Sequence, residues 1–208
     1  MVEIKIIDYG MGNLRSIQKS FEKVGATAII TSDIEDIKNA GAVVLPGVGA
    51  FEDAIKNLEN GGFVDVIRDK VDQGTPFLGV CLGMQLLFES STEGGFFEGL
   101  KVLPGVVDRF PANLNVKVPH MGWNELIFKD PGHFLLDGIP EGNYVYFVHS
   151  YHPITNTENV VATTIHGHEF TAIVKNAQGN LVATQFHPEK SSTLGLKMLE
   201  NFLNFCQK

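Results

Sequence analysis

A single cysteine lies at a point in the sequence where a nucleophile could be held. In the stretch GVCLG, Cys81 follows the apolar run 77–80 and has Gly79 and Gly83 two residues away on either side. Glycines at these places remove side chains where a strand and the next helix crowd together, and they tolerate a strained turn. The layout predicts a nucleophile elbow with cysteine in place of serine. A lone cysteine in an apolar run is also typical of a buried structural thiol.

Two backbone N–H groups could serve an oxyanion beside this thiol. Because a helix is expected to begin after Cys81, its first N–H groups would favour the thiolate, and that of Leu82 would point toward the same place as the sulfur. The stretch LPGVGAF ends another apolar run, and its two glycines allow the Val48 N–H to be a second donor. An ordinary strand-to-helix loop would have the same composition, so this second signal is only supportive.

A general base is available in the stretch QFHPEKS. In an extended segment His187 and Glu189 would point the same way, so the carboxylate could orient the imidazole, and Pro188 would fix that extended geometry. Taken alone, this tripeptide is also typical of a histidine at a strand end whose ring is hydrogen-bonded and has no catalytic role. Together with Cys81, the two residues complete a nucleophile, a base and an orienting group.

The elements that must position these residues follow from hydrophobic periodicity. In the first ninety residues short apolar runs alternate with helical patterns, which is typical of βαβ units on a parallel sheet. We expect strands at 4–7, 28–30, 42–45 and 77–80 and helices at 14–24, 33–38, 51–58, 63–71 and 84–89. The second half is β-rich, with strand-like runs at 102–110, 124–128, 144–148, 160–164, 170–175 and 181–186, a hairpin loop at 176–180 and a terminal helix. No linker separates the halves, which predicts one α/β domain over residues 1–208 with a central, mostly parallel sheet.

Composition excludes several partners. The 208 residues include 16 basic and 24 acidic side chains, which gives a formal net charge of -8. The chain therefore has no excess of positive charge with which to bind nucleic acid or an anionic membrane surface. The N-terminal stretch lacks the layout of a secretory signal, and the two cysteines suggest no disulfide framework, so we expect a cytoplasmic protein. The stretch 10–15 lacks the third glycine of a dinucleotide fingerprint, and the histidines lack zinc-site spacing, so neither that cofactor nor a metal is expected.

Three stretches together resemble the class I glutamine amidotransferases, whose Cys-His-Glu triad hydrolyses the side-chain amide of glutamine. They are PGVGAF at 46–51, GVCLGMQLLFE at 79–89 and QFHPEKS at 185–191. The stretches DYGMGNLRS, VPHMGWN and YVYFVHSY are more specifically similar to the glutaminase subunits of imidazole glycerol phosphate synthases, of the histidine pathway. The resemblance implies a three-layer, flavodoxin-like sandwich and a reaction without a cofactor.

The resemblance also implies roles for individual residues. Cys81 would attack the carboxamide of glutamine, His187 would pass a proton to the leaving ammonia, and water would hydrolyse the thioester. Residues implied in substrate binding are Gly49, Gln85, His149, Ser150 and Tyr151. Glu93, just beyond the elbow helix, is our candidate for the α-ammonium group of the substrate.

A partner follows from the same resemblance, because free ammonia is mostly protonated in water. The family partner is a (βα)₈-barrel cyclase subunit that consumes the ammonia in a heterodimer. We place four residues at that interface: Asn13, Trp123, Tyr144 and Tyr146. A Gly47-Val48 peptide that is free to flip predicts low glutaminase activity without the partner. This function has two alternatives. One is a stand-alone cysteine hydrolase of the same fold, such as a γ-glutamyl hydrolase or a peptidase. The other is a non-catalytic binding subunit.

Overall fold

An eight-stranded sheet runs through the molecule in the order β2-β1-β3-β4-β14-β13-β12-β9. The structure, a computed structural model, describes residues 2–208. Its strands are β1 (Glu3–Ile7), β2 (Thr27–Thr31), β3 (Ala42–Gly47), β4 (Phe77–Cys81), β9 (Ile127–Phe128), β12 (Val160–His166), β13 (His168–Lys175) and β14 (Leu181–Thr184). Neighbours from β2 to β14 pair in parallel, and the other three pairs are antiparallel. The sheet is therefore mixed, with the expected parallel part followed by an antiparallel extension.

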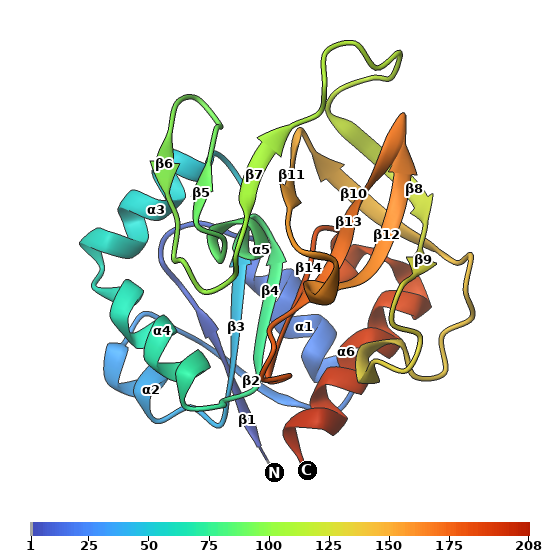
Figure 1. The fold of residues 1–208 in the computed structure, drawn as a ribbon. Coiled ribbons are helices and arrows are strands. Elements are labelled where there is room, and N and C mark those ends of the chain that lie inside the picture. The colour runs from blue at the N-terminus through green and yellow to red at the C-terminus, as the bar shows by residue number, and fades with distance from the viewer. Residues whose placement is uncertain (1) are drawn as a thin grey trace.

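Helices cover both faces of the parallel strands, which gives three layers (Figure 1). One face carries α2 (Ile34–Lys38), α3 (Phe51–Asn60) and α4 (Phe63–Asp72), and the other carries α1 (Leu14–Lys23) and α6 (Ser192–Cys206). Ile17 of α1 and Phe202 of α6 are buried in one apolar cluster, and Leu58 of α3 and Ile67 of α4 in a second. Among residues 2–208, none of the helices has the length and apolar character needed to span a membrane.

The β-rich second half adds two small sheets. One pairs β10 (Tyr144–His149) with β8 (His120–Glu125), and the other has the order β11-β7-β5-β6. Its strands are β5 (Ser90–Ser91), β6 (Phe97–Glu98), β7 (Val106–Arg109) and β11 (Tyr151–Ile154). The predicted strand 102–110 is wrong in its first part, because Pro104 has no N–H for a ladder and Gly105 has φ +121°. The hairpin loop at 176–180 is confirmed between β13 and β14.

The helix after the elbow differs from its predicted bounds. It is α5 (Leu82–Leu86), so it begins directly after Cys81 and ends before residue 89. The carbonyl groups of Leu86 and Leu87 accept hydrogen bonds from the N–H groups of Leu100 and Val102. The chain that returns beside α5 thus takes up the carbonyls that a longer helix would have used, and the helix stops.

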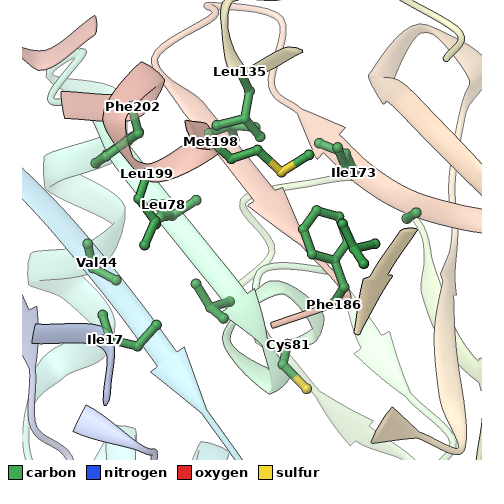
Figure 2. Close-up of a cluster of buried hydrophobic side chains, with 14 of the residues drawn as sticks. Ile17, Val44, Leu78, Cys81, Leu135, Ile173, Phe186, Met198, Leu199 and Phe202 are labelled. Atoms are coloured by element: carbon green, nitrogen blue, oxygen red, sulfur yellow. The ribbon is translucent and has the colours of Figure 1, made fainter. Parts of the chain in front are cut away.

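The end of β4 places Cys81 at the border of the apolar cluster beneath α1 and α6. Figure 2 shows Phe186 nearby and the Cys81 sulfur pointing away from the labelled core side chains. Cys81 is only 6% exposed, but its sulfur does not point into the apolar cluster. Burial and outward orientation together fit a thiol that faces a pocket.

Candidate active site

The elbow geometry predicted around Cys81 is confirmed. Cys81 has φ 56° and ψ -112°, which is rare for a residue with a side chain, and it is the last residue of β4 and directly precedes α5. A Cβ at Gly79 would lie 2.9 Å from the Cβ of Ala183, and a Cβ at Gly83 would overlap the carbonyl oxygen of Leu45. Both positions therefore require glycine, because β14 lies too close to Gly79 and β3 too close to Gly83 for a side chain, as the spacing of the glycines indicated.

The loop with the second predicted oxyanion donor lies beside the elbow. Gly47, the last residue of β3, pairs with Cys81 in the parallel register, and Val48 follows it. The Tyr9 hydroxyl donates a hydrogen bond to the carbonyl oxygen of Pro46 at 3.0 Å. A Cβ at Gly47 would come within 2.7 Å of that hydroxyl oxygen, so only glycine lets the loop run this close to the turn.

His187 and Glu189 form the expected contact by a different route. His187 Nδ1 and Glu189 Oε1 are 2.8 Å apart, and both side chains are almost fully buried. The segment is not extended as predicted, because Pro188–Lys190 forms a 3₁₀ turn, η3. Proline is well suited to the first position of such a turn, since its φ is compatible and its missing N–H would have had no partner there. The turn, not strand alternation, brings the carboxylate to the ring.

Strand β10 holds the backbone of His187 in place. The His187 N–H donates to the carbonyl oxygen of Tyr146 at 2.9 Å. The Ser191 hydroxyl donates to the His187 carbonyl at 2.6 Å and accepts from the Tyr146 N–H at 2.9 Å. The base is thus anchored to the same strand that carries both predicted interface tyrosines.

The surroundings of His187 favour its charged form. Burial alone would lower its pKa, but attraction of the charged ring to the Cys81 sulfur and the Glu189 carboxylate outweighs this and raises the pKa to about 10. Nε2 of the ring is buried and makes no well-aligned hydrogen bond with residues 2–208, although the Cys81 sulfur is near enough to affect the pKa. This free nitrogen is the atom through which the ring could exchange a proton.

We expect the His187–Glu189 pair to make stability depend on alkaline pH. Because the pKa of His187 in the folded protein, about 10, lies above the ordinary value of 6.5, the stabilisation is fully present below pH 6.5 and is lost as the pH rises toward 10. Urea unfolding of the wild type and of Glu189→Gln across this range measures it. The advantage of the wild type should shrink with rising pH, and a constant difference would contradict the assignment. An NMR titration of the His187 ring, with a lower pKa expected in Cys81→Ala, provides the control.

A pocket of about 300 Å³ opens in front of Cys81 and gathers most of the predicted site. The predicted residues that line it are Val48, Gly49, Cys81, Leu82, Gln85, Glu93, His149, Ser150, Tyr151 and His187. Glu189 lies behind the ring of His187. Three lining residues were not predicted: Pro119, Val148 and Lys190. All three lie inside stretches that carry the resemblance, QFHPEKS, VPHMGWN and YVYFVHSY, so their positions in these motifs could have revealed them.

Glu93 reaches the pocket from beyond the elbow helix. Its Oε2 accepts a hydrogen bond from the Phe51 N–H at the start of α3, at 3.0 Å. Burial raises the pKa of Glu93, and this hydrogen bond opposes the rise without cancelling it. A half-buried carboxylate on the pocket wall is suited to receive a cationic group.

The predicted interface residues occupy two places. Trp123 of β8 faces Tyr146 of β10 in the antiparallel register, with ring centroids 6.0 Å apart, and Tyr144 lies on the same face. Trp123 and Tyr144 are 52% and 55% exposed. Asn13 is exposed on a different element, at the residue before α1. The structure therefore brings three of the four into one exposed aromatic face, which we call the β8–β10 face.

The histidines cluster in a way that their spacing did not indicate. Five of them surround the buried ring of Phe110: His120, His149, His152, His166 and His168. Within residues 2–208, no three side chains of metal-binding type are grouped so that they could hold an ion. Burial lowers the pKa of His120 and His152 to about 4 each, so both rings are neutral at neutral pH.

The chain is similar to known proteins over nearly its full length. The family model described as glutamine amidotransferase class-I matches residues 5–205. The chain is 52% identical to the imidazole glycerol phosphate synthase subunit HisH of Geobacter metallireducens, across 97% of this chain and 98% of that one. It is 51% identical to the protein of the same name from Aquifex aeolicus, across 98% and 97%. A solved glutamine amidotransferase structure has the same fold, with a TM-score of 0.75 and 20% identity over 99% of both chains. The chain therefore belongs to the class I glutamine amidotransferase family.

Proposed function

We propose that this chain is the glutaminase subunit of an imidazole glycerol phosphate synthase in histidine biosynthesis. The observation that carries the proposal is the pocket in which the strained Cys81 faces the buried His187–Glu189 pair. The identity of about half of all residues with HisH proteins over nearly the full length supports the specific pathway.

The geometry supports a two-step hydrolysis. The Cys81 sulfur attacks the carboxamide carbon of glutamine, and the N–H groups of Leu82 and Val48 stabilise the negative oxygen of the tetrahedral intermediate. His187 gives a proton to the leaving nitrogen, which departs as ammonia and leaves a thioester on Cys81. Water then attacks the thioester while His187 accepts its proton, and glutamate and the free thiol are formed. Glu189 keeps the ring oriented and stabilises its charged form.

The pocket walls can bind both ends of the substrate. Glu93 offers a carboxylate to the α-ammonium group, and it is held in place by the start of α3. Gly49, Gln85 and the segment from His149 to Tyr151 form the rest of the wall that contacts glutamine. Gly49 has φ +106°, a conformation open to glycine that brings backbone close to the ligand.

The β8–β10 face is suited to the docking of a (βα)₈-barrel cyclase. Val148 of β10 lines the pocket, and in the antiparallel register it lies opposite the exposed Met121, so the face continues directly into the pocket mouth. A subunit bound to Trp123, Tyr144 and Tyr146, and reaching Asn13, would cover the pocket and receive ammonia before water protonates it. This arrangement is a heterodimer with ammonia channelling.

Mixing the chain with a candidate cyclase, glutamine and the cyclase substrate tests the function. We expect imidazole glycerol phosphate to form from glutamine only when both subunits are present, and the glutaminase rate to be low without the cyclase. An equal glutaminase rate with and without the cyclase would favour a stand-alone hydrolase instead.

Trp123→Ala, titrated with the cyclase in the same assay, should weaken docking without changing the chemistry at Cys81. Loss of a central aromatic anchor typically weakens an interface by about 2 kcal/mol, or roughly 30-fold in the dissociation constant. Phe96→Ala removes an exposed aromatic side chain from the turn between β5 and β6 and is the matched control. If Trp123→Ala binds the cyclase as tightly as Phe96→Ala does, the β8–β10 face is not the docking surface.

A further inference from the structure

An amide group contacts the Cys81 sulfur from the side of β14. Gln185 is fully buried, and its Nε2 donates to Cys81 Sγ at a distance of 3.9 Å, which is long but within reach for sulfur. Its Oε1 accepts from Gln85 Nε2 at 3.0 Å. Its backbone N–H is bonded to the Ala172 carbonyl. Neither the triad nor the two oxyanion donors account for this side chain.

The contact is one end of a continuous chain of hydrogen bonds. Gln85 Nε2 also donates to the Tyr151 carbonyl at 2.9 Å, and the same oxygen is 2.8 Å from His149 Nδ1. His149 Nε2 is 3.1 Å from His120 Nδ1, and His120 Nε2 is 3.3 Å from Asn124 Nδ2. The chain thus runs from Cys81 to β8, where Asn124 directly follows Trp123 of the β8–β10 face.

The carbonyl oxygens in this chain set the direction of every hydrogen bond. Because the Tyr151 oxygen can only accept, His149 carries its proton on Nδ1, and its Nε2 must accept. His120 therefore carries its proton on Nδ1 and accepts at Nε2 from the Asn124 amide.

The Asn124 amide is itself oriented at both ends. Its Nδ2 donates to the Ile165 carbonyl at 2.8 Å, and its Oδ1 accepts from the Glu125 N–H at 2.9 Å. At the other end of the chain, Gln185 accepts from Gln85, so the nitrogen of the Gln185 amide is the atom that faces Cys81.

The two histidines are held in the neutral form that this order requires. Burial lowers the pKa of His149 well below its ordinary value and that of His120 to about 4. His120 is further held by stacking on Phe147 and on His166, with centroids 4.8 and 4.2 Å apart. A second proton on either ring would place a donor against a donor in the chain.

We infer that Gln185 stabilises the Cys81 thiolate through its amide N–H, and that the chain from Asn124 through His120, His149, Tyr151 and Gln85 positions that amide. An N–H aimed at the sulfur favours the charged thiolate over the neutral thiol. His120 and Asn124 act through other groups and are positioning residues. The inference rests on the proposed function, because it deepens the account of Cys81 as the nucleophile.

The pH profile of Cys81 alkylation by chloroacetamide tests the contact, with the labelled peptide identified by mass spectrometry. In Gln185→Met, which keeps the volume but has no donor, we expect about ten-fold slower alkylation at neutral pH and a profile shifted to higher pH. The limiting rate at high pH should match the wild type, because the thiol is then ionised in both proteins. A misplaced sulfur would instead lower the high-pH limit, and that result, or an unchanged profile, would overturn the inference.

A second set of variants tests the hydrogen-bond chain at a distance from the sulfur. His120→Phe keeps the aromatic packing but removes both hydrogen bonds, and we expect roughly three-fold slower alkylation at neutral pH. His120→Asn can place an N–H near the position of Nδ1 and should recover part of the rate. His166→Phe, which keeps the stacking and lies outside the chain, is the control and should behave as the wild type. Equal alkylation rates in His120→Phe and His166→Phe would show that the hydrogen-bond chain does not position the Gln185 amide.

These outcomes are distinguishable from failure of the proposed function. If Cys81→Ala still hydrolyses glutamine, the nucleophile is wrong and the function fails. If Cys81→Ala is inactive while Gln185→Met keeps the wild-type alkylation profile, the function stands and only the role of Gln185 is rejected.

Discussion

Replacement of Cys81 by alanine is expected to reduce glutamine hydrolysis by a factor on the order of 10⁴ or more, since loss of the nucleophile of a triad removes the covalent route altogether. His187, Glu189 and the oxyanion donors would remain, but they have no thioester to form or hydrolyse. Glutamate release measured with the cyclase bound reports this loss.

The matching control uses ammonia in place of glutamine. Cys81→Ala with the cyclase should still form imidazole glycerol phosphate from added ammonium salt, because the cyclase chemistry does not use the thiol. The variant should also remain folded, with a circular-dichroism spectrum like that of the wild type, since one buried sulfur atom is removed from the edge of the apolar cluster. Glutamine-dependent product formation by Cys81→Ala would refute the mechanism.

Gly83→Ala should strongly lower the stability of the folded protein. The added methyl group would overlap the Leu45 carbonyl oxygen and press on Pro46 of the same strand, so α5 and β3 must separate. Overpacking of this kind costs about 3 kcal/mol or more when the obstacle is backbone. A shift of about 1 Å in the elbow would also lower the glutaminase rate by about 10²-fold.

Urea unfolding and the glutaminase rate of Gly83→Ala are the two measurements. Gly132→Ala is the matched control, because a Cβ there would meet only the Asp130 side chain at 3.9 Å. We expect the control to change the free energy of unfolding by less than about 0.5 kcal/mol. A Gly83→Ala protein as stable and as active as Gly132→Ala would show that the elbow is not held by this close approach.

The sequence by itself determined the local features of this protein. The alternation of strands and helices up to residue 81, the glycines around Cys81 and the hairpin at 176–180 are all encoded within a few residues, because they depend on periodicity and on backbone conformations open to glycine. Val48, Cys81 and His187 are likewise found together, since they lie at or just beyond the ends of the neighbouring parallel strands β3, β4 and β14, which meet at one edge of the sheet.

Only the tertiary structure decided how these pieces meet. The contact between His187 and Glu189 comes from a 3₁₀ turn that β10 and Ser191 hold in place, and α5 ends where a distant segment takes its carbonyl groups. The cluster of histidines around Phe110 joins strands far apart in the chain, and the hydrogen-bond chain to Gln185 depends on it. Such contacts depend on packing between segments separated by up to about a hundred residues, and no local pattern records which of them will touch.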